Sequence, residues 1–285
     1  MKRNFTRSKK NEKILFSKNK NVIKEGKNII LKNNLNLKPN QLVLYGNHAV
    51  LSALQNKQRK LHYLISTKEN YMQWEKSIKD FGLKIEIIIK TREQLDVINN
   101  FKPHQNVILI VEPLKRISLD EFLIEQQFIS KHPLRIIILD QVTDPQNVGA
   151  IIRSAYAFKM DALALSQTNS PIESIGMSKA SSGTIEKLKI IELSNMSRAI
   201  RKLQDANFHV YGLANGGYGS VLDLEKEDGN VAVIVGSEGK GLRRLTREKV
   251  DQLLKIPINP DSESLNVSNA ASISMFQLQK NIIKN

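Results

Sequence analysis

The second half of the chain alternates short apolar runs with helix-like segments, and this pattern most constrains the fold. The apolar runs are expected to be strands at 135–139, 162–165, 187–193, 208–213, 231–235 and 253–256. The segments between them are expected to be helices at 148–159, 173–181, 196–206, 242–250 and 267–282. Continuous apolar strands separated by helices are typical of a parallel sheet covered on both faces. We therefore predict an α/β domain over residues 135–285, with ligands bound at the carboxyl ends of its strands.

A smaller α/β unit is expected before this domain, over residues 41–114. Strand-like segments at 42–46, 61–65, 84–89 and 107–111 alternate there with helix-like segments at 49–54, 71–81 and 93–99. Ser118 followed by Glu121 is typical of a capped helix start. Residues 115–134 are interpreted as the linker between the two domains.

Basic residues are concentrated in residues 1–38, which carry +10 of the chain's net charge of +15. Low hydrophobicity with high charge is typical of disorder, so residues 1–40 are expected to form a disordered basic tail. Such a tail on a nearly balanced globule indicates a polyanionic partner, and nucleic acid is the expected one. A solvated lysine-rich tail without a partner and an organelle presequence are the alternatives.

The composition also excludes several kinds of site. The chain has no cysteine, and its five histidines show no spacing typical of metal ligands. Disulfides and thiolate metal sites are therefore excluded, and no metal is expected. No apolar run approaches the roughly 20 residues of a membrane span, and the N-terminus lacks the apolar core of a signal peptide. We expect a cytoplasmic protein with no membrane contact.

Three loops that follow expected strands carry binding chemistry. The first contains the turn signal Asp144-Pro145 and Asn147, which can cap the next helix. Arg153 lies on the same helical face as Gly149. A lone arginine at such a position is usually a surface or ion-pair residue, so this loop alone does not establish a site.

The second loop, Gly236–Gly241, follows an apolar strand and opens a helix, so its backbone N–H groups can face a ligand. Its glycine and lysine spacing fits neither a P-loop nor a dinucleotide-binding pattern. Glu238 would repel a phosphate but suits a cationic ligand or a ribose hydroxyl. A plain tight turn is the alternative.

The third loop lies between Ile256 and Val267. Ser264 and Asn266 offer a hydroxyl and an amide, and Leu265 offers backbone groups and an apolar side chain. A helix N-cap formed by Asn266 or Ser264 is the alternative interpretation.

Taken together, the three loops resemble the motifs of the SpoU/TrmH family of S-adenosylmethionine-dependent RNA ribose 2′-O-methyltransferases. The resemblance rests on Asn147-Val148-Gly149 with Arg153, on 236–241, and on Ile256-Pro257 with 264–268, and it covers residues 135–283. Residues 45–50 and 103–105 resemble, more loosely, the RNA-binding module and linker of the subfamily that methylates a guanosine in 23S rRNA.

The resemblance implies a parallel sheet whose C-terminal part is tied in a deep trefoil knot, and an N-terminal domain similar to ribosomal protein L30e. It also implies a homodimer with the active site at the subunit interface, an RNA substrate, and S-adenosylmethionine as methyl donor. By this analogy the cofactor is held by Gly236, Ile256 and Leu265, with Leu213, Ala214 and Gly216 nearby.

The same analogy places Arg153 near the target 2′-hydroxyl, where it is arranged by Asn147, Glu238, Ser264 and Asn266. Because the pKa of arginine exceeds ~12, we interpret Arg153 as holding the target phosphate and stabilising the forming alkoxide, not as a base.

Pro260, Gln141 and Asn106 depart from the residues common in the family, and Pro260 is expected to alter the loop path because it lacks an N–H and fixes φ. A tRNA ribose methyltransferase of the same family is one alternative, and the module at 41–112 favours rRNA over it. A catalytically inactive RNA-binding or ribosome-assembly factor is another, and the intact motif side chains argue against it.

Overall fold

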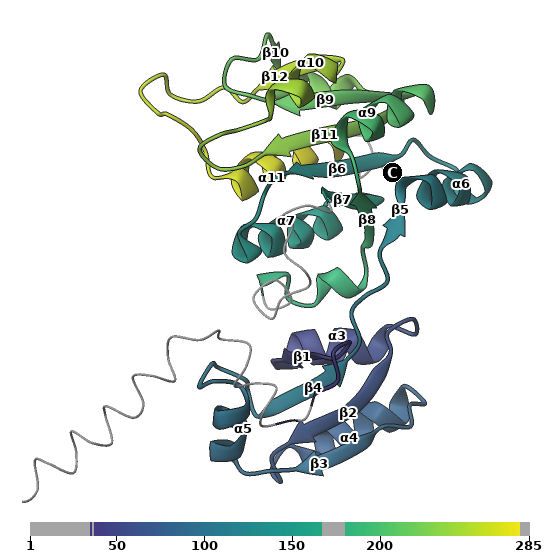
Figure 1. Ribbon diagram of the computed structural model, residues 1–285, viewed down its shortest axis with the longest axis vertical. Coiled ribbons are helices and arrows are strands. Elements are labelled where there is room, and N and C mark those ends of the chain that lie inside the picture. Colours follow the sequence, from purple (N-terminus) through teal and green to yellow (C-terminus); the bar gives the residue numbers. More distant parts are fainter. Residues whose placement is uncertain (1–34, 36, 167–179, 280–285) are drawn as a thin grey trace, which may run out of the picture.

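The computed structural model describes residue 35 and residues 37–166 and 180–279. Figure 1 shows two lobes, each built around one sheet and joined by the chain between β4 and β5. Most of the expected helix at 173–181 and nearly all of the basic tail fall outside the described residues.

The smaller lobe contains a four-stranded mixed sheet in the order β1-β4-β2-β3. β1 and β2 run antiparallel to β4, whereas β3 runs parallel to β2. One face packs apolar side chains under α3 and α4, and the other packs them under α5. The elements are β1 (Leu42–Tyr45), α3 (Asn47–Gln55), β2 (Leu61–Ser66), α4 (Tyr71–Asp80), β3 (Glu86–Ile89), α5 (Arg92–Ile98) and β4 (Val107–Val111).

The larger lobe contains an eight-stranded sheet in the order β10-β12-β9-β11-β6-β7-β8-β5, and all of its strand pairs are parallel. The predicted parallel α/β architecture is therefore confirmed. The strands are β5 (Ile117–Ser118), β6 (Arg135–Asp140), β7 (Ala162–Ser166), β8 (Lys189–Leu193), β9 (Phe208–Leu213), β10 (Gly219–Ser220), β11 (Asn230–Gly236) and β12 (Gln252–Lys255). The helices are α6 (Leu119–Ile129), α7 (Pro145–Ala157), η1 (Thr184–Glu186), α9 (Met196–Asp205), η2 (Val221–Lys226), α10 (Arg244–Lys249) and α11 (Val267–Gln279).

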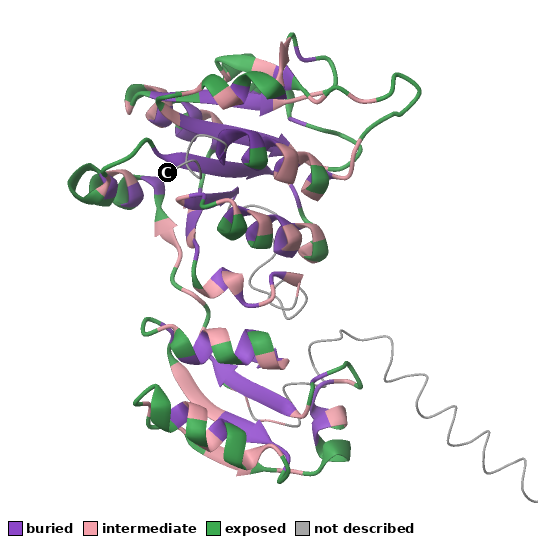
Figure 2. Cartoon of the chain, turned by 180° about the vertical axis from the view of Figure 1, so that it is seen from behind, coloured by how far each residue is buried: buried purple, intermediate pink, exposed green. Residues whose placement is uncertain are grey.

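Both faces of the large sheet are buried, as continuous apolar strands require. Ile137 and Leu139 of β6 pack on one face with side chains of α7 and α11. Ile136 and Ile138 of the same strand pack on the other face with side chains of α6 and α9. Figure 2 shows the central strands buried along most of their length.

The expected linker at 115–134 contains two elements that belong to the large lobe. β5 adds to the edge of the sheet beside β8, and Leu119 and Phe122 of α6 are buried in its core. The capping signal that begins α6 has the expected geometry, because Ser118 and Glu121 each accept a hydrogen bond from the other's backbone N–H. The free connection between the sheets is therefore shorter than the sequence pattern suggests.

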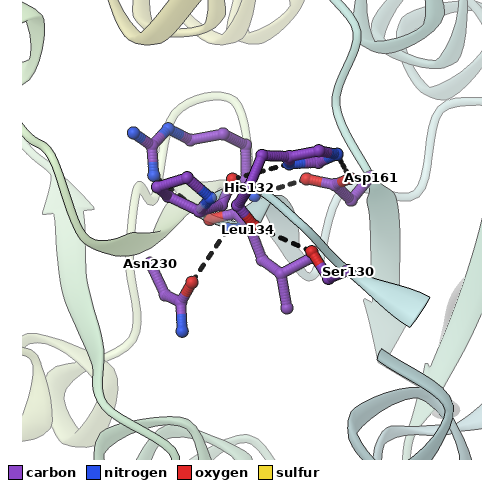
Figure 3. A network of polar contacts seen from close by, with 7 residues as sticks. Ser130, His132, Leu134, Asp161 and Asn230 are labelled. Carbon is purple, nitrogen blue, oxygen red and sulfur yellow. Dashed lines mark hydrogen bonds and ion pairs between the residues drawn. The ribbon is translucent and has the colours of Figure 1, made fainter. Parts of the chain in front are cut away.

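A polar network closes the amino-terminal edge of the large sheet (Figure 3). The Asp161 carboxylate accepts a 2.7 Å hydrogen bond from the Arg135 backbone N–H, and Asn230 accepts one of 2.8 Å from the Leu134 N–H. The buried Arg135 guanidinium donates to the carbonyl oxygens of Glu227 and Gly229. Burial lowers the pKa of Arg135 and raises that of Asp161. This edge is fixed, and the opposite edge carries the three loops.

Candidate active site

A pocket of about 380 Å³ opens at the carboxyl ends of β9, β11 and β12. The loops that follow these three strands line it. Its volume falls within the roughly 300–1,000 Å³ that is usual for small-molecule and cofactor sites. All six residues predicted to bind the cofactor lie in its lining: Leu213, Ala214, Gly216, Gly236, Ile256 and Leu265.

Gly236 allows two backbone segments to touch beneath this pocket. A Cβ at that position would lie 2.1 Å from the carbonyl carbon of Gly241 and 2.3 Å from the nitrogen of Leu242. The Gly241 N–H donates a 2.8 Å hydrogen bond to the Ser237 carbonyl, which closes the loop. Gly239 and Gly241 have φ values of 85° and 63°, where glycine is favoured. The glycine spacing thus builds a narrow loop whose backbone borders the pocket.

Asp140, at the end of β6, anchors the far side of this glycine loop. Its fully buried carboxylate accepts hydrogen bonds from the Arg243 Nε (2.7 Å), the Arg243 backbone N–H (3.2 Å) and the Thr246 hydroxyl (2.7 Å). Asp140 was not predicted from the sequence. The signal that could have identified it is an acid that directly follows the apolar run 136–139 and precedes a functional loop.

A chain of side-chain hydrogen bonds joins all three predicted loops beside the pocket. The Asn266 amide donates to the Asn147 amide oxygen at 3.0 Å, and the Asn147 amide donates to the Glu238 carboxylate at 3.3 Å. The Asn266 oxygen accepts from the Ser268 N–H at 2.9 Å. Each amide therefore donates toward the carboxylate, which fixes the orientation of Glu238 in the pocket lining.

The expectation that Asn147 caps its helix is wrong. Asp144 caps α7, because its carboxylate accepts from the backbone N–H groups of Gln146 and Asn147, and Pro145 occupies the first helical position. The Asn147 side chain is thereby left to bridge the loops. Asn266, by contrast, has both of the roles considered for it. Its amide oxygen accepts a hydrogen bond from the first turn of α11, and its amide nitrogen donates to Asn147 beside the pocket.

The remaining two predicted residues differ in position. Ser264 lines the pocket next to Leu265. Arg153 is exposed on α7, about one and a half turns beyond Asn147, and it is absent from the pocket lining. Among the described residues it has no ion pair or hydrogen-bond partner. One chain alone therefore does not place Arg153 in the pocket.

The third loop is held by a hydrogen bond from the loop that follows β9. The Asn215 amide donates a 2.7 Å hydrogen bond to the Glu263 carbonyl, which ties the loop after β9 to the loop after β12. Pro260 lies in an exposed turn, in which Asn259 accepts hydrogen bonds from the N–H groups of Asp261 and Ser262. A proline suits such a turn because it presets φ, so Pro260 fits this path. Asn215 and Arg247 also line the pocket, and neither was predicted from the sequence.

Within the described part of the chain, no group of three or more histidine, aspartate or glutamate side chains is arranged to hold a metal ion. None of the described helices is long and apolar enough to cross a membrane.

Comparisons with known proteins match both lobes. Residues 134–276 match the SpoU rRNA Methylase family, and residues 43–116 match the family described as RNA 2′-O ribose methyltransferase substrate binding. A Staphylococcus epidermidis protein assigned to the TrmH family of tRNA/rRNA methyltransferases is 32% identical over 242 residues, which covers 84% of this chain and 95% of that protein. The 23S rRNA (guanosine-2′-O-)-methyltransferase RlmB of Vibrio vulnificus is 31% identical over 240 residues, which covers 82% of this chain and 94% of RlmB. The AdoMet-bound rRNA methyltransferase of Sinorhizobium meliloti has a similar fold, with a TM-score of 0.73, 21% identity, and coverage of 91% of this chain and 97% of that one.

Proposed function

Because this chain belongs to the SpoU/TrmH family of RNA 2′-O-ribose methyltransferases, we propose that it transfers a methyl group from S-adenosylmethionine to the ribose of a guanosine in 23S rRNA. The hydrogen-bonded chain from Asn266 through Asn147 to Glu238 carries the proposal, because it joins three distant loops beside one cofactor-sized pocket. The name of the Vibrio vulnificus relative supports a guanosine of 23S rRNA as the target.

The pocket residues fit S-adenosylmethionine, which supplies a methyl group already activated for transfer. Because Gly236 has no Cβ, its backbone can lie against the backbone of Gly241 and Leu242. This close contact brings backbone groups of the glycine loop to the pocket, where they can hold a ligand. Ile256 and Leu265 offer apolar surface in the same pocket, and Leu213, Ala214 and Gly216 also line it. Holding donor and acceptor in line can supply on the order of 7–11 kcal/mol of the barrier reduction in ideal cases.

Arg153 is proposed to hold the phosphate of the target nucleotide and to stabilise the forming alkoxide, while Asn147, Glu238, Ser264 and Asn266 arrange the groups around it. Its permanent charge suits both roles and excludes that of a base. Its exposed position on α7 supports an active site completed by a second copy of the chain.

We therefore propose a homodimer that uses the surface of α7 and α11. Tyr156 lies one helical turn after Arg153 and is 42% exposed, and Phe276 on the neighbouring α11 is 48% exposed. Two exposed aromatic side chains on packed helices are typical of an interface. Sedimentation of the full chain tests this: we expect twice the monomer mass, and a monomer for Tyr156→Glu. A monomeric full chain would contradict it.

The proposed organisation has a basic tail at 1–40, an L30e-like RNA-binding domain at 41–114 and a methyltransferase domain at 135–285 with a C-terminal trefoil knot. The segment 115–134 between the domains adds β5 and α6 to the large lobe. The two separate sheets, each with its own apolar core, support the division. The loops that follow β9, β11 and β12 line one pocket, which supports a closely packed C-terminal part of the methyltransferase domain.

Two alternatives lead to different measurements. A tRNA ribose methyltransferase would leave tRNA, not rRNA, without a 2′-O-methyl group when the protein is absent. Mapping of 2′-O-methylation in both RNAs from a strain that lacks this protein therefore identifies the substrate, and unchanged rRNA would contradict the 23S proposal. An inactive RNA-binding factor would show no heat of binding with S-adenosylmethionine at micromolar to millimolar concentrations, and that result would remove the enzymatic proposal altogether.

A further inference from the structure

A second cavity, of about 230 Å³, lies where the two lobes meet. The small lobe supplies Tyr45, His48, Pro103 and Gln105 to its wall, and the large lobe supplies Ser182. This cavity shares no residue with the cofactor pocket, and the proposed methyl-transfer chemistry does not use it. Its small-lobe wall falls within residues 45–50 and 103–105, which lie in the part of the chain that matches the substrate-binding family.

The lobes are joined at this point by buried contacts. Glu186 of η1 accepts a 2.9 Å hydrogen bond from the Asn56 amide and lies 3.6 Å from the Arg59 Nε. The side chains of Arg59 and Glu186 are 0% and 1% exposed. Gly183, with φ of 81°, lies so close to α3 that a Cβ would be 2.8 Å from the His48 carbonyl oxygen. Gly183 therefore leaves no room for a side chain against α3, and the buried contacts of Glu186 hold the two lobes together.

The loop that carries Gln105 is also fixed. The buried His104 ring contacts the Asp96 carboxylate at 3.0 Å through Nε2 and accepts the Asn106 N–H at 3.0 Å through Nδ1. The Gln105 side-chain oxygen accepts the Asn47 N–H at 2.8 Å. This arrangement turns the amide nitrogen of Gln105 into a donor without a partner among the described residues.

Two wall residues adopt a strained backbone. Gln105 and Ser182 have φ values of 52° and 51°, in the left-handed region that residues with a side chain rarely adopt. Such conformations cost ~1–3 kcal/mol each and gather at ligand clamps and active sites. One of these two residues comes from each lobe. Among the described residues, six other non-glycine residues also have a positive φ.

The wall chemistry suits a flat, polar-edged group. The exposed His48 offers an aromatic ring, whereas Tyr45 borders the cavity but is only 5% exposed. Gln105 and Ser182 offer an amide and a hydroxyl. The volume is below the roughly 300–1,000 Å³ of pockets that hold whole cofactors, so one planar ring system fits better than a nucleotide cofactor. Unpaired RNA bases stack on aromatic rings such as that of His48 and form hydrogen bonds along their edges.

We propose that this cavity binds one unpaired base of the RNA substrate. The proposal rests on RNA being the substrate, as the proposed function states. Because both lobes form the wall, the cavity exists only while the lobes are in contact. Binding of a base there therefore depends both on an unpaired base in the RNA and on the arrangement of the two lobes.

Fluorescence titration of the full chain tests the proposal. The probe is an RNA hairpin with 2-aminopurine at an unpaired loop position, and the comparison probe is a fully paired duplex of equal length. We expect tighter binding of the hairpin and quenching of its 2-aminopurine by stacking. Equal affinity for both probes would overturn the proposal, whatever the variants show.

The variants identify the cavity as the site. Gln105→Glu keeps the oxygen that accepts the Asn47 N–H but replaces the free donor with an acceptor, and His48→Ala removes a stacking ring. We expect each to weaken hairpin binding by about tenfold, the usual loss for one stacked base or one reversed hydrogen bond. Gln73→Glu, which adds the same charge on an exposed face of α4 in the same lobe, should bind as the unaltered chain does. Unchanged binding by both cavity variants would overturn the assignment.

Methyl transfer to unmodified 23S rRNA separates this proposal from the proposed function. If the unaltered chain transfers methyl groups but the cavity variants bind the hairpin normally, only the cavity assignment fails. If the unaltered chain transfers none, the proposed function fails, and hairpin binding still decides the cavity.

Discussion

Replacing Gly236 with alanine tests whether the close backbone contact beneath the glycine loop shapes the cofactor pocket. The added carbon would lie 2.1 Å from the Gly241 carbonyl carbon, whereas real Cβ contacts essentially never fall below 3.0 Å. The shortfall is 0.9 Å, and because the opposing atoms are backbone, no side chain can rotate away. The loop itself must move. Overpacking of this kind costs typically ~1–3 kcal/mol.

That cost can appear in two measurable quantities. If the loop keeps its position in the free protein, the folded state carries the strain and the free energy of unfolding falls. If the loop instead shifts in the free protein, ligand binding must restore its position, and the affinity for S-adenosylmethionine falls. A penalty of ~1–3 kcal/mol carried wholly by binding corresponds to about a 5- to 150-fold weaker Kd. We therefore expect the loss in binding free energy, measured by isothermal titration calorimetry, and the loss in free energy of unfolding, measured by thermal unfolding, to add up to ~1–3 kcal/mol.

Gly229→Ala is the matched control for this variant. An added Cβ at Gly229 meets no atom within 4 Å, and the residue lies at the opposite edge of the sheet, before β11. We expect its cofactor affinity and unfolding temperature to match those of the unaltered chain. Gly236→Ala with both quantities unchanged would refute the argument that the glycine is required for close approach.

Four further predictions follow from the site and the fold. Arg153→Ala should abolish methyl transfer in a radiolabelled-donor assay and leave cofactor affinity nearly unchanged, since Arg153 lies outside the pocket lining; retained turnover would remove it from the chemistry. Asp140→Ala should lower the free energy of unfolding in a denaturant titration by about 2 kcal/mol, because charged hydrogen bonds are lost. This is less than the ~3–5 kcal/mol that breaking a fully buried ion pair costs, because the Arg243 side chain is 42% exposed. A loss near zero would be inconsistent with an anchoring role. Burial raises the pKa of Asp161 above 3.8, so folding favours its protonated form, and the unaltered chain should lose stability relative to Asp161→Asn as the pH rises from about 3.8 through the raised pKa; a stability difference that does not vary with pH would contradict this. Deleting residues 1–38, which carry a net charge of +10, should weaken RNA binding and flatten its dependence on salt; an unchanged slope would show that the tail does not touch RNA.

The central strands of the large sheet were predictable because they are buried on both faces, and such burial leaves an unbroken apolar run in the sequence. β6 and β11 were expected at 135–139 and 231–235, and each is longer by only one or two residues. The two-residue strands β5 and β10 were not predicted, since two residues carry no period.

The candidate site was less predictable because its contacts depend on residues far away in the chain. Asn147 was expected to cap a helix, as asparagine often does locally. Its actual role depends on Asn266, 119 residues later, and on Glu238, 91 residues later. No local rule contains such a pairing. The homodimer, the knot, the cytoplasmic location and the role of Arg153 stay predictions.

The two partners of the hydrogen bond between Asn147 and Asn266 are synthesised at different times. Ribosomes add about 5–20 residues per second, so roughly 6–24 s separate the synthesis of these two partners. At the end of that interval, while the roughly 25 residues between Gly241 and Asn266 are added, a nascent chain carries the first loop and the glycine loop without the wall that α11 and its preceding loop provide. We expect the growing chain to be unable to retain S-adenosylmethionine until α11 has emerged. Cofactor binding would then distinguish complete molecules from unfinished ones as they leave the ribosome.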